Sequence, residues 1–596
     1  MDTRRQLGSR STTTSSSPSP LPHRISVLLL AGILCLIGCS DPPGDEQQAT
    51  GPDASLTDTD IDSDDVAGDP GDTGHGSDID EDPDDADKPP SHVSQAVKDA
   101  VTRPDFDAWR GRSWEITPDA TLPDDWMLET PPAETWGGSA YGLDVVTACD
   151  ETDDDCDPDF ELEECDTDPD CQAGGTCEEV AATVTSPGDE PRSFCVGHSH
   201  RNYDVMYGHI HDAEQLVDVT SLYPPDGPFL AAIRNAITYL ANAGESVELR
   251  LQFASTPLDE LDVDEVIDEL GRDLPSSHDL QISVGTYQEG LNSWNHAKIV
   301  AVDGDAALVG GMNMSTHSYL RNNPVFDLSM SMTGATATDA HRFADGLWDF
   351  VCDAEYAGEG GFTNHASSPD DDCPTRRGRD LERPETDGDV WTASLGRYGD
   401  IGPGVADAAI TAALASAEES LKLSVQDIGP MQIGPVESNS WPTPLLDILA
   451  KGIADGIDVE ILMTTPVTNG GGSDGAYSNG WSKDDLVGRI EERLRLSDVW
   501  LDDGETVDDV LCDRLRVSSL RPYDDATWPD GEEFANHAKS FIVDDRAFYI
   551  GSQNLYPAEL AEFGYLIDDD EAAEALLDTY WDPLWATSES EIEHAC

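Results

Sequence analysis

The sequence predicts an α/β protein whose C-terminal two thirds consists of two similar halves, each with a mixed sheet covered by helices on both faces. Two observations predict this class. Helical and strand-like hydrophobic patterns alternate along residues 197–596, and one short pattern occurs twice with identical spacing. A polar segment rich in Asp, Arg and Pro, residues 353–392, separates the halves 197–352 and 393–596.

The first half follows a helix-and-strand order up to the repeated pattern. Apolar periodicity predicts a helix over residues 229–243 and buried strands over 247–253 and 280–284. The repeated pattern is expected on a pair of strands with a turn at Asp303-Gly304, and a further strand and a helix close the half. These last elements are expected at 297–302, 306–309, 327–332 and 339–352.

The second half repeats this order, so the same reasoning applies to each of its elements. A helix and a strand come first, then a second helix and strand, then the strand pair that carries the repeated pattern, and a last helix from Glu571. The expected ranges before that last helix are 405–421, 423–425, 445–454, 459–463, 538–543 and 547–550.

The repeated pattern reads H-x-K-x4-D-x6-G-x-x-N, and Asn precedes the His in both copies. Side chains two apart on a strand leave the same face of a sheet, so each half offers an imidazole and an ammonium group together. The Asn returns on the second strand, and the Gly would let the backbone pass close to a ligand. The copies consist of His296, Lys298, Asp303, Gly310 and Asn313, and of His537, Lys539, Asp544, Gly551 and Asn554.

These residue types suit a reaction at the phosphorus of a phosphodiester. Lysine charge and amide N–H groups stabilise the phosphoryl oxygens as negative charge redistributes. One neutral imidazole can attack phosphorus while a second, protonated imidazole delivers a proton to the departing alkoxide. The second imidazole then activates water or another alcohol. Because the lysines supply the positive charge, this chemistry predicts no metal and no cofactor.

The two motifs resemble the HKD motif of the phospholipase D superfamily, which is followed by G-S-x-N or G-G-x-N. The second copy continues with Gly551-Ser552-Gln553-Asn554, the commoner form. The first continues with Gly310-Gly311-Met312-Asn313, a variant also met in cardiolipin-synthase-like members. The resemblance covers about residues 197–590. It implies two α/β/α halves related by a pseudo-twofold axis, with the active site in the cleft between them.

The resemblance also implies roles for the site residues. His296 is expected as the nucleophile and His537 as the general acid, an assignment by chain order that leaves the reverse open. A carboxylate beyond each motif often orients the imidazole in this superfamily, and Asp327 and Glu562 lie at suitable distances after their histidines; the alternative is that they are ordinary surface acids. The motif residues Asp303 and Asp544 are expected to secure the hairpin rather than to touch substrate.

Charge composition restricts the partners. The formal net charge is −88, with 33 basic and 121 acidic residues. Such a surface repels polyphosphate, so nucleic acid is an unlikely partner. We expect a monomer that acts on phospholipid.

The N-terminus has the pattern of a bacterial export signal, residues 1–39. Arginines precede an apolar run from Ile25 to Gly38, too short to cross a bilayer comfortably, and Cys39 follows Gly38 as in the lipobox of lipoproteins. With Ser40 after the cysteine, we expect an outer-membrane lipoprotein of a Gram-negative-type bacterium, on either the periplasmic or the cell-surface side. Residues 40–92 are almost free of apolar side chains and predict a disordered acidic tether.

Cysteine usage agrees with an oxidising compartment. Residues 93–196 are expected to hold an N-terminal segment and a cysteine-rich insert, stapled by disulfides because it has few apolar residues. The cysteine spacings lack the C-x2-C pairs typical of zinc sites. Proximity favours Cys352 with Cys373, and Cys512 with Cys596 is what remains. The pairs His198-x-His200 and His209-x-His211 would each share a face on strands, as metal ligands do, but exposed or cleft histidines are the ordinary explanation.

The sequence therefore predicts an exported, lipid-anchored phosphodiesterase that hydrolyses phospholipid or exchanges its headgroup through a phosphohistidine intermediate. Two alternatives remain: a nuclease of the same superfamily, and a surface-binding lipoprotein whose catalytic site has decayed.

Overall fold

A computed structural model describes residues 91–140, 162–171, 175–197, 199–255, 261–289, 293–320, 323–352, 366–367, 374, 377–399, 401–433, 436–437, 440–465, 478–497 and 506–592. The chain divides into two compact units, Met1–Ala86 and Asp87–Cys596. The predicted export signal, Cys39 and the tether up to residue 90 lie outside the described residues. All described elements belong to the second unit.

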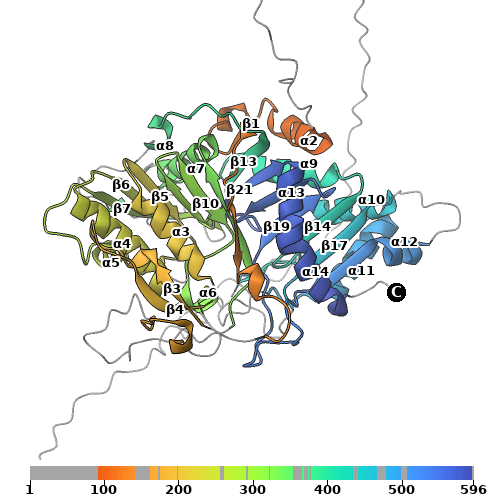
Figure 1. The fold of residues 1–596 in the computed structure, drawn as a ribbon. Helices are drawn as coiled ribbons and strands as arrows, with labels where there is room; N and C mark the ends of the chain where they lie inside the picture. Colours follow the sequence, from red (N-terminus) through yellow and green to blue (C-terminus); the bar gives the residue numbers. More distant parts are fainter. Residues whose placement is uncertain are drawn as a thin grey trace, which may run out of the picture. The chain divides into compact units, whose positions relative to one another are not determined.

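The first of two large sheets is mixed, as the sequence predicts (Figure 1). Its strands are β2 (Met127–Thr130), β5 (Leu216–Thr220), β6 (Glu248–Ala254), β7 (Gln281–Glu289), β8 (Ser293–Trp294), β9 (Ile299–Val302), β10 (Ala306–Gly310), β11 (Asp327–Thr333) and β12 (Ala366–Ser367). They lie in the order β12-β7-β6-β5-β9-β10-β11-β2, with β8 paired to β7. Strands β5, β6 and β7 are parallel, and the pairs from β5–β9 to β11–β2 are antiparallel.

The second sheet repeats this plan. Its strands are β1 (Trp114–Ala120), β13 (Val390–Tyr398), β14 (Ser420–Val425), β17 (Asp458–Met463), β18 (Leu515–Ser519), β19 (Lys539–Val543), β20 (Ala547–Gly551) and β21 (Ala561–Asp568). Their order is β18-β17-β14-β19-β20-β21-β13-β1. Strands β14, β17 and β18 are parallel, and the pairs from β14–β19 to β13–β1 are antiparallel. Strand for strand, β7-β6-β5-β9-β10-β11-β2 corresponds to β18-β17-β14-β19-β20-β21-β13.

Part of the segment before residue 197 is integral to both sheets. Strand β2 pairs with β11 in the first sheet, and β1 pairs with β13 in the second. Helix α2 (His92–Val101) packs against α9 (Val405–Ala415), and its Val93 and Val97 belong to the core of the second half. The cysteine-rich insert is therefore only one part of this segment.

Helices cover the sheets in the way that their apolar faces require. The first half has α3 (His200–His211), α4 (Gly227–Ala243), α5 (Val263–Leu270), α6 (Thr316–Tyr319), α7 (Ala335–Cys352) and α8 (Arg377–Asp380). The second has α9, α10 (Thr443–Ala454), α11 (Lys483–Leu496), α12 (Val507–Arg514), α13 (Asp570–Leu576), a π-helical turn Leu577–Trp581 and α14 (Asp582–Ser588). Among the described residues, no helix combines the length and the apolar character needed to cross a membrane.

Alternation along each central strand decides which core a side chain joins. On β9, Ile299 and Ala301 enter a core shared with α7 and with the second sheet, while Val300 and Val302 pack with α3 and α4. On β19, Ile542 joins the same shared core, and Phe541 packs toward α9 and α10. The face of each sheet that is not covered by its own outer helices is thus buried in a core to which both halves contribute.

One predicted helix is shorter than expected. The apolar pattern predicted a helix over 405–421, but α9 ends at Ala415 and β14 already begins at Ser420. The backbone N–H groups of Glu418, Glu419 and Ser420 donate to the carboxylate of Asp544, at 2.7 to 3.2 Å. A contact with a residue so far along the chain overrides local helix propensity here.

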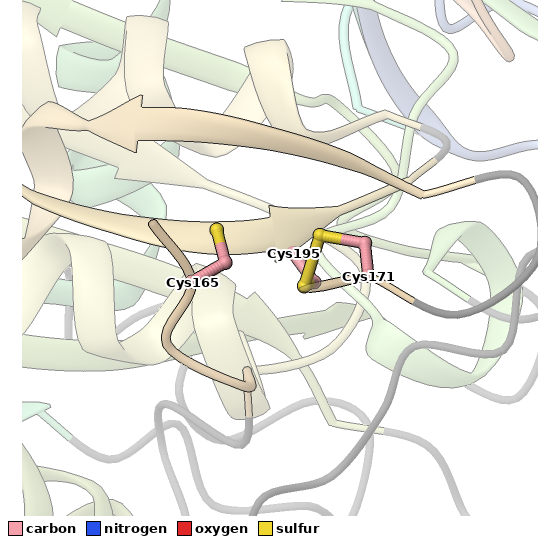
Figure 2. Close-up of side chains that lie close together, drawn as sticks. All are labelled: Cys165, Cys171 and Cys195. Carbon is pink, nitrogen blue, oxygen red and sulfur yellow. A yellow bond between two sulfur atoms is a disulfide. The ribbon is translucent and has the colours of Figure 1, made fainter. Parts of the chain in front are cut away.

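The cysteine-rich insert is held by two disulfides, which confirms the disulfide prediction for its four described cysteines. Cys165 pairs with Cys177 and Cys171 with Cys195, around the hairpin β3 (Thr176–Val180) and β4 (Arg192–Val196). Three of the sulfur atoms, those of Cys165, Cys171 and Cys195, lie within 4.8 Å of one another (Figure 2). Sulfur engaged in a disulfide is not a thiolate ligand, so this cluster is a covalent knot.

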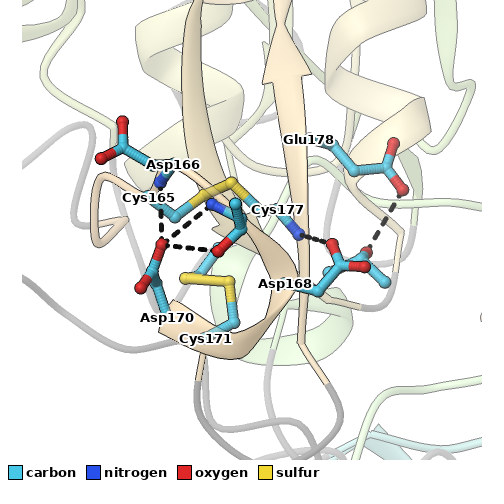
Figure 3. Close-up of a disulfide and its surroundings, with 10 residues drawn as sticks. Cys165, Asp166, Asp168, Asp170, Cys171, Cys177 and Glu178 are labelled. Atoms are coloured by element: carbon cyan, nitrogen blue, oxygen red, sulfur yellow. Dashed lines mark hydrogen bonds between the residues drawn. A yellow bond between two sulfur atoms is a disulfide. The ribbon is translucent and has the colours of Figure 1, made fainter.

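Aspartates build the turn within the knot (Figure 3). The carboxylate of Asp170 accepts hydrogen bonds from the backbone of Asp166 and Thr167, and that of Asp168 accepts from the N–H of Cys177 at 3.0 Å. The hairpin then packs through Phe194 on the core of α3 and α4. Cys352 and Cys512 are also disulfide-bonded, but their predicted partners, Cys373 and Cys596, lie outside the described residues.

The histidine pairs considered as metal ligands do not lie on strands. His200, His209 and His211 belong to α3, where residues two apart do not share a face. His200 contacts Glu178 at 3.4 Å, and Nδ1 of His211 is 2.7 Å from Asp212. His198 lies outside the described residues.

Candidate active site

The His and Lys of both copies of the repeated motif lie at the start of a central strand, at equivalent places in the two sheets. His296 and Lys298 come before β9, and His537 comes before β19, which begins at Lys539. Lys298 Nζ donates to the carbonyl oxygen of its own His296 at 2.7 Å, and Lys539 Nζ donates likewise to His537. All four residues are at most 5% exposed. The strands predicted over 297–302 and 538–543 are confirmed as β9 and β19, which begin at Ile299 and Lys539.

The asparagine before each histidine fixes the start of the motif strand to the neighbouring parallel strands of the sheet. Asn295 Nδ2 donates to the carbonyls of Ser221 and Gln252, both at 3.0 Å, at the ends of β5 and β6. Asn536 Nδ2 donates at 3.1 Å to Ser424 Oγ and to the carbonyl of Leu462, on the corresponding strands β14 and β17. The sequence showed this repeated Asn but gave it no role.

Each histidine is held by the other half of the chain. The N–H of His296 donates to the carbonyl of Ala561 at 2.8 Å, and its Nδ1 lies 3.0 Å from Oε1 of Glu562. The N–H of His537 donates to the carbonyl of Phe326 at 2.7 Å, and its Nδ1 lies 2.7 Å from Oδ2 of Asp327. The sequence analysis associated each carboxylate with the histidine of its own half, and the structure exchanges them.

Asp327 and Glu562 are not surface acids, because their exposed fractions are 1% and 0%. A carboxylate that faces Nδ1 accepts the hydrogen there, so the second ring nitrogen, Nε2, remains for a substrate. Sequence offsets could not reveal the exchange, since it depends on how the two sheets meet.

Two residues that the sequence analysis missed complete these pairs. The Tyr319 hydroxyl donates to Oδ2 of Asp327 at 2.7 Å and accepts from the N–H of Asn313 at 3.2 Å. Arg397 on β13 donates to Oε2 of Glu562, and also to Asp407 at 2.8 Å. The Arg397–Glu562 pair spans 165 positions of the chain, and no local pattern marks Tyr319 or Arg397.

The motif asparagines lie beside the histidine–carboxylate pairs and differ in their hydrogen bonds. Asn313 is 4% exposed, and its Oδ1 has no hydrogen-bond partner among the described residues. Asn554 is 5% exposed and donates from Nδ2 to the Tyr556 hydroxyl at 2.8 Å, while its N–H faces Oε1 of Glu562 at 3.4 Å. Both amides thus border a histidine–carboxylate pair.

The motif glycines are required by a neighbouring strand; the close approach to a ligand that was expected of them stays a prediction. A Cβ on Gly310 would lie 2.4 Å from the Cα of Ser329 on β11, and one on Gly551 would lie 2.6 Å from the Cα of Gly564 on β21. Gly311 replaces serine because its Cβ would lie 2.1 Å from Oδ1 of Asp327. Ser552, in the equivalent place, accepts from the N–H of Phe563 at 3.0 Å.

The motif aspartates lie in the turns after β9 and β19, with φ near +54°. Asp303 accepts three backbone N–H groups, those of Glu214, Gln215 and Leu216, at 2.5 to 2.8 Å. Asp544 accepts the corresponding groups before β14 and also contacts Nε2 of His92 at 2.7 Å. Each therefore fixes its hairpin to the start of the first parallel strand of its sheet.

Burial and mutual repulsion dominate the electrostatics. Burial, then the charges of Lys298 and Lys539, hold the pKa of His296 well below its usual range, and burial followed by the same two charges does so for His537. Burial and Lys539 lower the pKa of Lys298 well below its usual value, and burial lowers that of Lys539 to about 7. The four groups therefore form one electrostatic site, although they come from two halves.

The carboxylates shift the other way. Burial raises the pKa of Asp327 to about 6, against the opposing charge of Lys539, and it raises the pKa of Glu562 against that of Arg397. Buried cations that repel one another are stabilised by an anion between them. The arrangement is therefore prepared to receive a negatively charged group.

Two cavities in the described part of the chain lie apart from the motif histidines. One, of about 330 Å³, is lined mainly by apolar residues between α4 and α5, including Leu230 and Val266. The other, of about 520 Å³, is lined by His92, Asp544 and further acids. Neither is lined by a motif His, Lys or Asn.

Two corresponding sheets, each contributing one buried His, Lys and Asn to a shared centre, define a duplicated α/β fold with a single composite site. No model of a known protein family matches the chain. Over 445 residues the chain is 31% identical to phospholipase D of Streptomyces antibioticus, a match that covers 66% of this chain and 77% of that protein. The chain belongs to the phospholipase D family.

Two solved structures are also similar. Phosphatidylserine synthase of Haemophilus influenzae Rd KW20 matches with a TM-score of 0.45 and 14% identity, over 70% of this chain and 89% of that one. Polyphosphate kinase of Porphyromonas gingivalis matches with a TM-score of 0.33 and 12% identity, over 63% and 47%.

Proposed function

We propose that this protein is an exported phosphodiesterase of phospholipase D type that acts on phospholipid, by hydrolysis or phosphatidyl transfer, through a phosphohistidine intermediate. The observation that carries the proposal is the exchanged pairing of His296 with Glu562 and of His537 with Asp327. It leaves one Nε2 in each half for opposite sides of a single phosphorus atom, beside two lysines.

In the first step, the Nε2 lone pair of His296 attacks phosphorus. The P–N bond forms as the bond from phosphorus to the headgroup oxygen breaks, and the departing alkoxide takes the proton from Nε2 of His537. Lys298, Lys539, Asn313 and Asn554 stabilise the phosphoryl oxygens, whose negative charge increases in the transition state. The headgroup alcohol leaves, and the phosphatidyl group stays on His296.

In the second step, His537 is neutral and acts as the base. It accepts a proton from water or from an alcohol as that oxygen attacks phosphorus, and the P–N bond breaks. His296 regains its lone pair and His537 its proton, so the site returns to its first state. Water gives phosphatidic acid, and an alcohol gives a new phosphatidyl ester.

Phospholipid is the proposed substrate because the relative in Streptomyces antibioticus is named a phospholipase D and because charge opposes nucleic acid. The chain has a formal net charge of −88, which disfavours a polyanion far more than a single phosphodiester at a membrane surface.

We further propose that Cys39 carries the lipid anchor and that residues 40–92 tether the enzyme to the outer membrane, on its periplasmic or its outer side. The apolar run before Cys39 and the two disulfides of the insert support an exported protein. Radiolabelled palmitate tests the anchor: incorporation that is lost in Cys39→Ala supports it, and an unlabelled wild type contradicts it.

The central experiment is product analysis with mixed phospholipid vesicles and a competing primary alcohol. We expect phosphatidic acid, a phosphatidyl ester, or both, with neither product from His296→Asn or His537→Asn. DNA supplied in parallel tests the nuclease alternative: cleaved DNA with unchanged lipid would refute the lipid proposal. A wild type that never yields a phosphohistidine would instead support the decayed binding protein.

A further inference from the structure

The two histidine–carboxylate pairs differ in one neighbour, at a position that the duplication makes equivalent. In the second sheet, β13 places Arg397 directly opposite Glu562 of β21. In the first sheet, β2 occupies the corresponding place and puts Thr130 opposite Asp327 of β11. A cation in one half thus replaces a neutral hydroxyl in the other.

The hydrogen bonds follow this difference. Arg397 is 8% exposed and donates to Glu562, to Asp407 at 2.8 Å and to the carbonyl of Leu560 at 3.1 Å. The side chain of Asp327 instead accepts from two neutral donors, the Tyr319 hydroxyl at 2.7 Å and its neighbouring backbone N–H at 2.9 Å. Glu562 therefore has a counterion of its own, whereas Asp327 offers its charge to His537.

We propose that Arg397 is a positioning residue that makes the two pairs unequal, so that His296 meets the phosphodiester as a neutral nucleophile and His537 carries the proton. This inference rests on the proposed function and adds to it the physical cause of the division of roles. Chain order supplies no such cause.

Two electrostatic effects weaken the binding of a proton to His296. A carboxylate already paired with a guanidinium stabilises a neighbouring imidazolium less than one bonded to neutral donors. The guanidinium also repels a proton on His296: its charge lowers the pKa of that ring, after burial, Lys298 and Lys539. For His537 the causes after burial are Lys539, Lys298 and His296.

All charged groups around the two rings enter this balance. The lysines act on both rings, so they do not distinguish them. Asp407 on α9 shares the Arg397 charge, and the charge of Glu559 also acts on Arg397. What remains is the difference between Arg397 with Glu562 and Tyr319 with Asp327, and it must outweigh the charge of His296, which lowers the pKa of His537.

Bis(p-nitrophenyl) phosphate is the probe that isolates the nucleophile. Its phenolate leaves without help from a general acid, so the acidic limb of the kcat/KM–pH profile reports the loss of the proton from the attacking histidine. Arg397→Met removes the cation and keeps the stem. We expect the acidic limb to move up by about one pH unit, because the ring now holds a proton more strongly. For the same reason, a smaller share of the label from radiolabelled substrate should be found on His296 after an alkaline quench.

Three variants make the result specific. Arg397→Lys keeps the charge and should keep the limb near its original place. Arg546→Met removes the ion pair in which Nε of Arg546 lies 2.9 Å from Oδ1 of Asp568 on β21. This variant should leave the acidic limb unchanged. Asp407→Asn removes the second carboxylate bonded to Arg397, so that the guanidinium pairs more strongly with Glu562, and it should move the limb down. The Asp407 side chain is 45% exposed, so this variant also decides the question if Arg397→Met does not fold.

The outcomes distinguish a failure of the role of Arg397 from a failure of the proposed function. An unmoved limb in Arg397→Met or Asp407→Asn, with normal turnover by the wild type, overturns the role of Arg397 alone. Wild-type label on His537 instead of His296 overturns it as well. A wild type without turnover and without label on either histidine sinks the proposed function, and this inference with it.

Discussion

Asp327 and His537 are 210 positions apart in the chain, yet Oδ2 of the first lies 2.7 Å from Nδ1 of the second. Glu562 and His296 are related in the same way, in the opposite direction along the chain. Each half therefore carries the carboxylate that its partner half needs. Damage to either half should disable the whole centre.

Asp327→Asn should lower kcat by about 10²- to 10⁴-fold with a smaller change in KM. The amide no longer fixes the hydrogen on Nδ1 or stabilises a protonated His537, so the general acid is lost. Tyr319→Phe removes only one hydrogen bond to the same carboxylate and should cost about tenfold or less. Steady-state kinetics on soluble short-chain phospholipid check both, with the exposed turn residue Asp305→Asn as the control. Equal losses in the three variants would contradict the assignment.

Binding of an anion should take up protons near pH 8. There Lys539, whose pKa burial lowers to about 7, is mostly neutral, and a nearby negative charge raises that pKa again. We expect uptake approaching about one proton per site for diethyl phosphate, a diester that does not itself titrate there. Calorimetry in buffers of different ionisation enthalpy measures it.

Two lysine variants control the proton measurement. Lys539→Met should lose most of the uptake, and Lys422→Met, in an ion pair with Asp545, should keep it. Identical binding heats in every buffer would show that the lysine is already charged in the free enzyme.

Asp544→Asn should destabilise the fold by about 2–4 kcal/mol, because the carboxylate accepts three backbone N–H groups and His92. Asparagine tolerates the positive φ of this turn, so the change isolates the lost charge. Urea unfolding measures it, with the exposed neighbour Asp545→Asn as the control.

The stability from Asp544 also has a defined pH dependence. Its hydrogen bonds outweigh burial and lower its pKa below the usual value. The contribution should therefore be complete above pH ~4 and disappear as the pH falls through the lowered pKa. A difference in the free energy of unfolding between wild type and Asp544→Asn that persists at the lowest pH would contradict the assignment of this stability to the Asp544 carboxylate.

The two disulfides of the insert should contribute unequally. The loops that they close differ in length, with sequence separations of 12 for Cys165–Cys177 and 24 for Cys171–Cys195. Each should stabilise by about 3 kcal/mol, and the longer loop by about 0.6 kcal/mol more, because loop-closure entropy rises with length. Paired Cys→Ser variants compared by urea unfolding provide the measurement. A larger loss from the shorter loop would contradict the entropic account.

Local patterns in the sequence predicted much of the fold. The apolar runs over 247–253 and 280–284 predicted the buried strands β6 and β7, and the identical motif offsets predicted the duplication that the two sheet orders display. Where prediction failed, the cause was a distant residue. Helix α9 ends early because Asp544 binds the backbone just before β14.

The candidate site divides in the same way. Fixed spacing marked His296 and His537, and it gave Asp327 and Glu562 as nearby acids. It could not show which histidine each acid serves, because that depends on the backbone bridges of Asn295 with Ala561 and of Phe326 with Asn536. No spacing pattern marked Tyr319 or Arg397: Tyr319 reaches Asp327 within the first half, and Arg397 reaches Glu562 between the neighbouring strands β13 and β21 of the second sheet.

Those bridges also restrict how molecules enter and leave. The backbone N–H of His296 donates to the carbonyl of Ala561 at 2.8 Å, and that of His537 donates to the carbonyl of Phe326 at 2.7 Å. Each histidine is thus hydrogen-bonded to the other half of the chain. Separation of the two halves would break the hydrogen bonds that orient both rings. We therefore expect substrate and product to enter and leave without separation of the two halves.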